Sequence, residues 1–473
     1  MTEKTYAIGL VGLGVMGRNL VLNIADHGFG VAGYDLDPEK TRSLQEEKES
    51  HHAVETANDM GAFLKLLQSP RAVMLLVPAG DPVDKVMDEL LRHLETGDLI
   101  IDAGNSHFAD TNRRIQRAAE KGVHFLGMGV SGGEKGARNG PSMMPGGAPE
   151  AYEQVRSILE AAAARVDDAP CVAYLGPGSA GHYVKMVHNG IEYGIMELIA
   201  ETYDLMARGL GLSNDRLHEI YDAWDRTELS GFLMQITARI FERKDEKSGR
   251  YLVDQIMDRA DQKGTGTWTV SDGLNQQVPV PTIDLAVNMR NLSMLKQQRL
   301  KIAASFGQVK GRSTGETDAE RLIEQLRSGL YAGMILTYAQ GMALLDRASQ
   351  AYGYRLDLGT VARIWRGGCI IRADLLENIM AAFERHPDLP NLLMDPELGR
   401  RVAQCREDLA AVSRTAAAMG IPAPGLMVSL AYFDAFRSAR LPANLIQAQR
   451  DYFGAHTYAR VDAEGHFHTD WEN

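Results

Sequence analysis

Short apolar runs alternate with longer stretches of mixed polar and apolar residues over the first 176 positions. The apolar runs are TYAIGLVG, GVAGYD, RAVMLLV, DLIIDAG, VHFLGMGV and CVAYLG. Strands that lack a polar face belong to parallel sheets covered by helices on both sides. The pattern therefore predicts a doubly wound α/β domain of the Rossmann type over residues 1–177, with one strand in each run.

The pattern changes at LGPGSAG, residues 175–181, the densest cluster of turn-forming residues after these runs. Beyond it no strand-like run appears, and apolar positions recur with helical spacing to about Arg437. We expect a large all-α domain over residues 178–437. Residues 438–473 form an aromatic-rich C-terminal tail that differs from the helical region, and we expect it to dock elsewhere.

Composition narrows the possible functions. The chain has 473 residues, with 62 acidic and 50 basic side chains and a formal net charge of −12. It contains no basic run, so a nucleic-acid partner is not expected. No apolar run could span a bilayer and the N-terminus does not resemble a signal peptide, so we expect a cytoplasmic protein without membrane association. Three scattered cysteines form no CxxC pair, which predicts neither disulfides nor a metal site.

The first predicted strand ends in a glycine-rich motif. Residues Gly12 to Gly17 read GLGVMG, and an acidic residue, Asp35, ends the next strand 18 positions later. This is the spacing of a dinucleotide-binding fingerprint, in which the glycines let the backbone approach a pyrophosphate and the carboxylate binds the adenosine ribose. A glycine-rich turn followed by a helix-capping aspartate is the alternative interpretation.

A second group of polar residues lies on the first helix predicted after the boundary. Its members share one face over two helical turns: Lys185, His188, Asn189, Glu192 and Tyr193. Spacing alone would fit a solvent-exposed face. Two glycines in the same segment favour close approach of another group, so we interpret the face as a wall of an active site. A lysine and a glutamate could take up and return a proton beside a carbonyl group, provided that burial lowers the pKa of the lysine.

A third motif, Ser131-Gly132-Gly133, follows the run VHFLGMGV at the carboxyl edge of the predicted sheet. Ligands bind at this edge in such folds, and the backbone amides of a glycine loop can hold an anion. An ordinary turn is the alternative for this motif on its own.

These and further motifs resemble one family along almost the whole chain. Seven segments stand in the order and at the spacing of the 6-phosphogluconate dehydrogenases, which are β-hydroxyacid dehydrogenases: GLGVMGRNL, IDAGNS, GVSGGEKGARNGPSMMPGG, GHYVKMVHNGIEYG, DQKGTGTWT, RIWRGGCIIR and ANLIQAQRDYFGAHTY. The resemblance implies oxidative decarboxylation of 6-phosphogluconate to ribulose 5-phosphate and CO2 in the pentose phosphate pathway. Hydride would pass to a nicotinamide dinucleotide, and the reaction would need no metal. The resemblance also implies a homodimer.

The same resemblance implies roles for individual residues. Lys185 would be the base that takes the C3 hydroxyl proton, and Glu192 would protonate C1 of the enediol. The cofactor would lie against Gly12, Gly14, Val15, Met16, Gly17, Asp35, Leu36, Val77, Ala79 and Asn105. The carboxylate and hydroxyls of the substrate would be held by Asn105, Ser131, Gly132, Gly133, His188 and Asn189. Its phosphate would be held by Tyr193, Lys263, Thr265 and Arg290, and the partner subunit's tail would complete the site with Arg450 and His456.

Two positions depart from the family pattern near the expected cofactor. Members that use NADP carry Asn-Arg-Thr or Asn-Arg-Ser after the second strand, where the arginine meets the 2′-phosphate, whereas this chain has Asp35-Leu36-Asp37. Many relatives read Leu-Val-Lys-Ala-Gly where this chain has Pro78 in place of the lysine. We therefore expect NAD in preference to NADP, because Asp35 would repel the extra phosphate. In the alternative, Lys40 or Arg42 reaches that phosphate.

Two other functions stay open at this point. A β-hydroxyacid dehydrogenase for a shorter substrate, such as 3-hydroxyisobutyrate, would share the Rossmann domain and the lysine, but it would lack the phosphate-binding residues. A non-catalytic, nucleotide-binding relative is the second alternative, and the presence of both acid–base residues argues against it.

Overall fold

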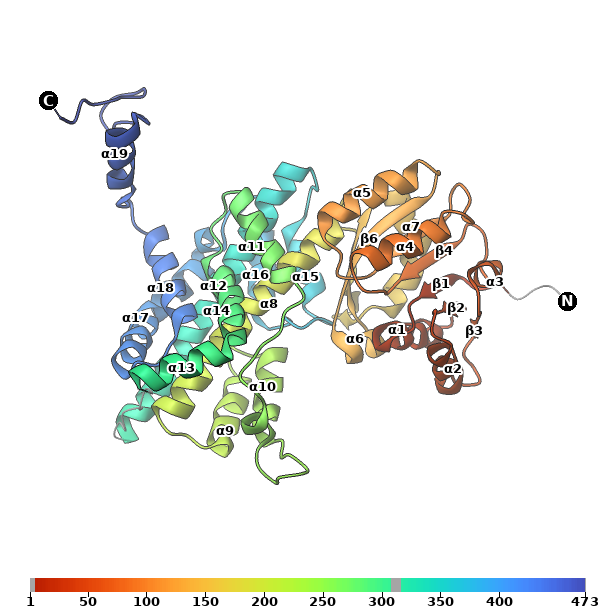
Figure 1. The fold of residues 1–473 in the computed structure, drawn as a ribbon, viewed down its shortest axis with the longest axis horizontal. Coiled ribbons are helices and arrows are strands. Elements are labelled where there is room, and N and C mark those ends of the chain that lie inside the picture. Colours follow the sequence, from red (N-terminus) through yellow and green to blue (C-terminus); the bar gives the residue numbers. More distant parts are fainter. Residues whose placement is uncertain (1–4, 308–315, 473) are drawn as a thin grey trace.

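A seven-stranded sheet organises the N-terminal part of the protein (Figure 1). The computed structural model describes residues 5–307 and 316–472. The strand order is β3-β2-β1-β4-β5-β6-β7, in which all neighbours are parallel except β6 and β7. The strands are β1 (Ile8–Val11), β2 (Val31–Tyr34), β3 (Val54–Thr56), β4 (Ala72–Leu75), β5 (Leu99–Asp102), β6 (His124–Ser131) and β7 (Ser142–Gly147).

Helices cover both faces of this sheet. They are α1 (Val15–Asp26), α2 (Pro38–Glu47), α3 (Met60–Lys65), α4 (Asp81–Leu90), α5 (Phe108–Ala119), α6 (Gly133–Asn139) and α7 (Pro149–Ala162). Successive residues of β4 point to opposite faces: Met74 packs in a core with α1, α6 and α7, and Val73 packs in a core with α3, α4 and α5. The predicted doubly wound Rossmann-type architecture is thus confirmed.

The strand predicted at CVAYLG, residues 171–176, is wrong. This segment is irregular, although the Cys171 carbonyl accepts a hydrogen bond from Met143 and the Leu175 amide donates one to Pro145. The seventh strand of the sheet is instead β7, whose sequence SMMPGG contains a proline and two glycines that argue against a strand. Proline is tolerated there because β7 is an edge strand, where one side of the backbone needs no ladder partner.

The rest of the chain is helical, and it follows a small ladder formed by β8 (Arg165–Val166) and β9 (Ala169–Pro170). The helices are α8 (Ala180–Asp204), η1 (Leu205–Gly209), α9 (Asn214–Trp224), α10 (Phe232–Glu242), η2 (Leu252–Gln255), α11 (Thr265–Asn275), α12 (Pro281–Met294), α13 (Lys296–Phe306), α14 (Glu316–Tyr352), α15 (Leu358–Trp365), α16 (Leu375–Arg385), η3 (Leu392–Met394), α17 (Pro396–Met419) and α18 (Pro424–Phe436). The expectation of a large helical region after the Rossmann-type unit is confirmed.

Helix α8 runs through the middle of the helical region and also packs on β6 and β7. It approaches α14 closely, because a Cβ atom added at Gly194 would lie 2.6 Å from the Thr337 side chain. Its residues 180–191 are buried on all sides, and of the polar face noted in the sequence Glu192 alone is partly exposed. This helix therefore joins the sheet to the helical core.

The C-terminal tail stands away from the rest of the chain (Figure 1). It consists of α19 (Ala443–Gly454) and a terminal segment that folds back on it, where the buried carboxylate of Asp451 accepts hydrogen bonds from the Thr457 and Thr469 amides and from the Trp471 indole. Several apolar side chains of α19 face solvent, and Phe453 is 73% exposed. The tail is thus ordered by its own contacts and leaves an apolar surface uncovered within one chain.

Two findings bear on the expectations from composition. Across residues 5–307 and 316–472, no helix has both the length and the apolar character needed to cross a membrane. Cys171, Cys369 and Cys405 are free thiols, and the first two are buried.

Candidate active site

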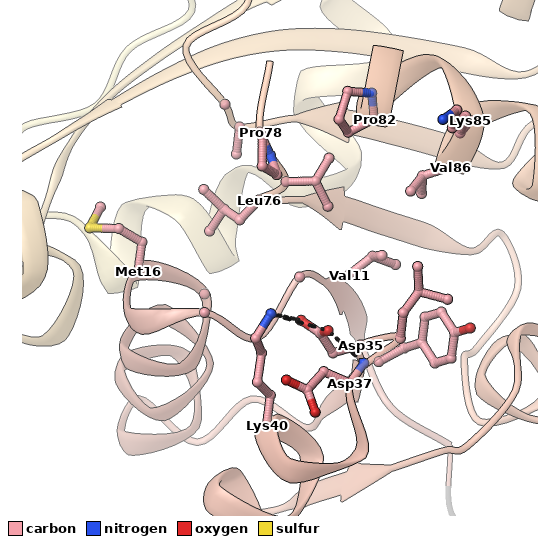
Figure 2. A pocket seen from close by; sticks show the side chains of 18 of the residues that line it. Val11, Met16, Asp35, Asp37, Lys40, Leu76, Pro78, Pro82, Lys85 and Val86 are labelled. Atoms are coloured by element: carbon pink, nitrogen blue, oxygen red, sulfur yellow. Dashed lines mark hydrogen bonds and ion pairs between the residues drawn. The ribbon is translucent and has the colours of Figure 1, made fainter. Parts of the chain in front are cut away.

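A cleft of about 750 Å³ opens at the carboxyl edge of the parallel strands. It is walled by the glycine-rich loop after β1, the residues after β2 and the loops after β4 and β5. Figure 2 shows Asp35 and Lys40 on one side of this cleft and Pro82, Lys85 and Val86 on the other. The cleft therefore lies where open α/β sheets bind their ligands.

Backbone geometry explains the glycines of the loop. Gly12 has φ of 99°, and a Cβ atom there would lie 2.5 Å from the Leu76 carbonyl oxygen. A Cβ atom at Gly17 would lie 1.9 Å from the Gly12 carbonyl oxygen, so α1 could not pack against the strand with any other residue. Gly14 faces open space. The loop thus leaves room for a pyrophosphate at the N-terminus of α1, which fits a bound dinucleotide.

Asp35 fixes the loop from the end of β2. Its Oδ2 accepts a hydrogen bond from the Leu13 amide at 2.7 Å, and its Oδ1 accepts one from the Asp37 amide at 2.9 Å. The Lys40 ammonium lies 3.4 Å from Oδ1. The residue that caps α2 is Asp37, whose carboxylate accepts from the Glu39 amide. Asp35 therefore does not serve as a helix cap, and its carboxylate remains part of the cleft wall.

Most of the expected cofactor residues line the cleft, namely Gly12, Gly14, Val15, Met16, Gly17, Asp35, Leu36, Val77 and Asn105. Ala79 is not part of the lining. Sequence reasoning missed the wall contributed by Tyr34, Met60, Pro82, Lys85, Val86 and Glu89. Most of these residues lie on helices α3 and α4, and only their position in space identifies them.

The Lys185 side chain lies between its own helix, α8, and the sheet. Its side chain is buried, and a Cβ atom at Gly129 of β6 would lie 2.3 Å from the Lys185 Cβ atom. The ammonium donates to Asn189 Oδ1 at 2.7 Å and lies 3.3 Å from His188 Nδ1. Burial lowers the pKa of Lys185, and the negative charge of Glu192 opposes this shift. The lysine thus has the environment that makes an amine an effective base.

His188 joins the other members of this face. Its Nε2 lies 3.3 Å from Ser131 Oγ, and its Nδ1 lies 3.8 Å from a carboxylate oxygen of Glu192. Burial, together with the charge of Lys185, lowers the pKa of His188 well below its usual value, so the ring is neutral. Burial raises the pKa of Glu192, against the nearby charges of Lys185 and Arg290. The interpretation of this face as solvent-exposed is excluded.

The Ser131-Gly132-Gly133 motif lies beside this face at the start of α6. Gly132 has φ of 111°, and a Cβ atom there would lie 2.5 Å from the Gly368 carbonyl oxygen. The motif is therefore a tight turn held against the segment RIWRGGCIIR of the helical region. Ser131 contacts this face of α8 through His188.

The residues expected to hold a phosphate lie farther along α8 and on two neighbouring helices. The Arg290 guanidinium of α12 lies 3.4 Å from the centre of the Tyr193 ring and donates to the Asp261 carbonyl. Thr265 is the first residue of α11, directly after Lys263 and Gly264. A hydrogen bond between Gln262 and Asn291 joins the two segments. The fold thus brings the middle of α8, the start of α11 and α12 together.

Arg450 and His456 are not brought to this site within one chain. The Arg450 guanidinium donates to Gln447 on its own helix, and the His456 ring packs edge-on against Phe453. Both residues lie on the tail that stands away from the helical region (Figure 1). Their expected role in a partner's site stays a prediction.

Two protein-family models match this chain, one over each of its two main parts. The model for the NAD binding domain of 6-phosphogluconate dehydrogenase matches residues 7–176, and the model for the C-terminal domain of 6-phosphogluconate dehydrogenase matches residues 181–471.

Relatives match over nearly their full length. A decarboxylating 6-phosphogluconate dehydrogenase of Synechocystis is 50% identical, with 100% of this chain and 98% of the relative covered. An NADP(+)-dependent decarboxylating 6-phosphogluconate dehydrogenase of Bacillus subtilis is 48% identical, with 98% of each chain covered. The solved structure of Plasmodium falciparum 6-phosphogluconate dehydrogenase superposes with a TM-score of 0.95 at 43% identity, covering 98% of this chain and 100% of that one. This chain therefore belongs to the 6-phosphogluconate dehydrogenase family.

Proposed function

We propose that this protein catalyses the oxidative decarboxylation of 6-phosphogluconate to ribulose 5-phosphate and CO2. The observation that carries the proposal is the buried face of α8, on which Lys185, His188, Asn189 and Glu192 contact one another beside the sheet edge where the cleft opens. Relatives that span the whole chain are named for this reaction. A non-catalytic relative would not need a desolvated lysine next to a neutral histidine.

The site residues divide the chemistry between them. A nicotinamide dinucleotide in the cleft would accept the hydride from C3. Neutral Lys185 takes the proton of the C3 hydroxyl, and the resulting ammonium then stabilises the charge that develops on the 3-keto oxygen as CO2 leaves. Glu192, whose raised pKa favours its protonated form, returns a proton to C1 of the enediol. Each proton taken from the substrate or returned to it thus has a named side chain.

Substrate recognition follows the same geometry. Asn105, Ser131, Gly132, Gly133, His188 and Asn189 hold the carboxylate and hydroxyls. The phosphate lies against Tyr193, Lys263, Thr265 and Arg290, because a dianion needs concentrated positive charge in an acidic protein. Arg450 and His456 of a second copy complete this end of the site in a homodimer with exchanged tails.

The cofactor is NAD in preference to NADP, although the Bacillus subtilis relative is named as NADP(+)-dependent. Asp35 presents its carboxylate at the ribose end of the cleft, where it would accept hydrogen bonds from ribose hydroxyls and repel a 2′-phosphate. Leu36 is 81% exposed and offers no charge to compensate. Arg42 is paired with Glu39, and Lys40 is the remaining cation beside Asp35.

Steady-state assays at 340 nm with 6-phosphogluconate and each cofactor test the proposal. We expect turnover with a ratio of kcat/KM in favour of NAD of about 10²-fold, the size expected for one repelled and unpaired phosphate. The double variant Asp35→Asn with Leu36→Arg should shift this ratio toward NADP, while Arg42→Met should leave it unchanged. Turnover of 3-hydroxyisobutyrate alone, or of neither substrate, would contradict the activity. A wild-type ratio in favour of NADP would contradict only the cofactor choice.

A further inference from the structure

A completely buried arginine lies behind the cofactor cleft. Arg114 of α5 has an exposed fraction of 0%, and it does not line the cleft. A buried guanidinium is tolerated only when its N–H groups are matched by acceptors. The acceptors of Arg114 lie in or next to two loops that both wall the cleft: Asp102 and Ser106 at the loop after β5, and Gly80 and Asp84 where the loop after β4 enters α4. We propose that Arg114 is a positioning residue for the dehydrogenase reaction, which holds these two loops in the arrangement that binds the dinucleotide.

The first loop follows β5 and carries Asn105. Arg114 Nη1 donates to Asp102 Oδ2 at 3.3 Å and to Ser106 Oγ at 3.1 Å. The Ser106 hydroxyl also donates to Asp102 Oδ2 at 2.6 Å, and the Gly104 amide donates to Asp102 Oδ1 at 3.1 Å. Both neighbours of Asn105 are therefore tied to the carboxylate that Arg114 binds. The backbone at Asn105 is set by this network.

The second loop follows β4 and includes Leu76, Val77 and Pro78 of the cleft wall. Arg114 Nη2 donates to the Gly80 carbonyl at 3.0 Å, where this loop enters α4. The guanidinium also binds both carboxylate oxygens of Asp84 on α4, at 3.0 and 3.1 Å. One side chain thus fastens the end of the second loop and the first turn of α4.

The two loops also touch each other in front of the arginine. A Cβ atom at Gly104 would lie 3.3 Å from the Val77 carbonyl oxygen. A displacement of one loop would therefore displace the other, because the packing leaves no space between them.

Helix α5 makes a further contact with the catalytic helix. One turn before Arg114, Thr111 Oγ1 lies 2.7 Å from Nδ1 of the buried His182, which precedes Lys185 by one turn on α8. The same face of α5 therefore contacts the helix of the proposed base and fastens both cleft loops. This arrangement fits a role in aligning the cofactor with the base.

The neighbouring arginine provides a matched control. Arg113 is 51% exposed and also binds Asp84, with Nη2 at 2.9 Å from Oδ2. Within the described residues its other partner is Asp110 on the same helix, and it reaches neither Asp102, Ser106 nor Gly80. The substitutions Arg114→Lys and Arg113→Lys both keep the charge beside Asp84. Only Arg114→Lys removes the planar guanidinium group that donates hydrogen bonds to both loops.

The test measures the dissociation constant for NADH by fluorescence titration, together with kcat and the KM for NAD, well below each variant's thermal midpoint. For Arg114→Lys we expect NADH binding weakened by about tenfold and kcat lowered by about tenfold, as for a small misplacement of reacting groups. Arg113→Lys should change each by less than about twofold, the range of a surface pair. The kinetic part rests on the proposed activity and the choice of NADH as probe rests on the proposed cofactor; if the wild type favours NADP, the same titration is made with NADPH, and it does not depend on turnover.

Several outcomes would overturn the proposal. It is wrong if the two lysine variants bind NADH and turn over alike, or if Arg114→Lys lowers only the thermal midpoint. If Arg114→Lys does not fold, Ser106→Ala replaces it, since this variant removes one acceptor of Nη1 and keeps the charges. Weaker NADH binding by Ser106→Ala supports the proposal, and wild-type binding overturns it. A wild-type protein that binds NADH but does not oxidise 6-phosphogluconate would refute the proposed function, and the titrations would still decide the role of Arg114.

Discussion

At the scale of single residues, the proposed chemistry depends on a lysine side chain that is buried away from solvent. Lys185 is 6% exposed, and among residues 5–307 and 316–472 its ammonium contacts the Asn189 oxygen and the His188 ring but no carboxylate. Desolvation disfavours the charged amine, and Glu192 is near enough to moderate this effect without pairing with it. The result is a lysine that can exist in its neutral form, which the proposed first proton transfer requires.

The first prediction is that Lys185→Met removes turnover while the protein still folds and binds its cofactor. Methionine fills a similar volume, and the neighbouring His188 is a poor substitute as base because burial lowers its pKa well below its usual value. We expect kcat to fall by about 10²- to 10⁴-fold, the usual contribution of a positioned base. Measurement of kcat and of NADH binding for the same preparation checks this. Near-wild-type turnover would contradict the assigned role of Lys185.

Sequence patterns identified this face because all of its members lie on one helix, where periodicity alone determines which side chains meet. The glycine loop and Asp35 were likewise recognisable, since their spacing in the chain reflects one strand–turn–helix unit. Arg114 was not recognised, because its acceptors belong to β5, two loops and α4, and no local pattern relates them. A buried arginine in a sequence looks the same as one on the surface.

At the scale of secondary-structure elements, α8 also supplies a cap to a distant helix. The carboxylate of Glu201 accepts hydrogen bonds from the amides of Gly425 and Leu426, at 2.5 and 2.8 Å, in the first turn of α18. The local sequence gives α18 no side-chain cap, and Pro424 has no amide hydrogen to donate. Burial raises the pKa of Glu201 to about 8, and the two amides oppose this shift. The start of α18 is therefore held by α8 and not by its own flanking residues.

The second prediction concerns this cap. Glu201→Ala leaves two buried amides without acceptors, and each such loss costs about 1 to 3 kcal/mol. We expect a clearly lower thermal midpoint and little change in kcat at temperatures where the variant is folded. Asp204→Ala is the control, because Asp204 lies one turn away and its ion-pair partner in the described part of the chain is the exposed Arg208. Equal midpoints for the two variants would show that the Glu201 contacts do not stabilise the fold.

Elements were predictable where one physical signal dominated. Five of the six apolar runs include strands of the sheet, because continuous burial on both faces leaves a clear pattern. The run at 171–176 is equally apolar but is buried as irregular chain against β7, so burial alone does not distinguish the two. Conversely, the strand with Pro145, Gly146 and Gly147 depends on its position at the sheet edge, which the sequence does not encode locally.

At the scale of the whole molecule, the exposed apolar surface of the C-terminal tail has no explanation within a single chain. Leu445, Ile446 and Phe453 are exposed on α19, and the two polar residues expected in the phosphate site lie on the same segment. Burial of such aromatic and aliphatic surface across a twofold interface would stabilise a dimer. The proposed exchange of tails would account for both the uncovered surface and the incomplete site.

The third prediction tests this exchange by mixing two inactive variants. Arg450→Ala subunits and Lys185→Met subunits are combined under conditions that allow dimers to re-form. If each site uses Lys185 from one chain and Arg450 from the other, every hybrid dimer regains one working site of two. Sites built within one chain would give no recovery. The control mixes Lys185→Met with a chain that carries both Lys185→Met and Arg450→Ala, because every site of that hybrid lacks Lys185.

The separation of the tail from its own core has a consequence for how the sequence can change over time. Residues up to about Arg437 are selected to fit neighbours in the same chain. Under the proposed exchange, the residues of α19 are selected to fit the surface of the partner subunit. The same gene encodes that surface, but it belongs to another molecule. A substitution in the tail would therefore favour a matching change in the surface of the partner that it contacts. Co-variation between the tail and the rest of the chain would then report a contact between subunits, although it would look like a contact within one chain.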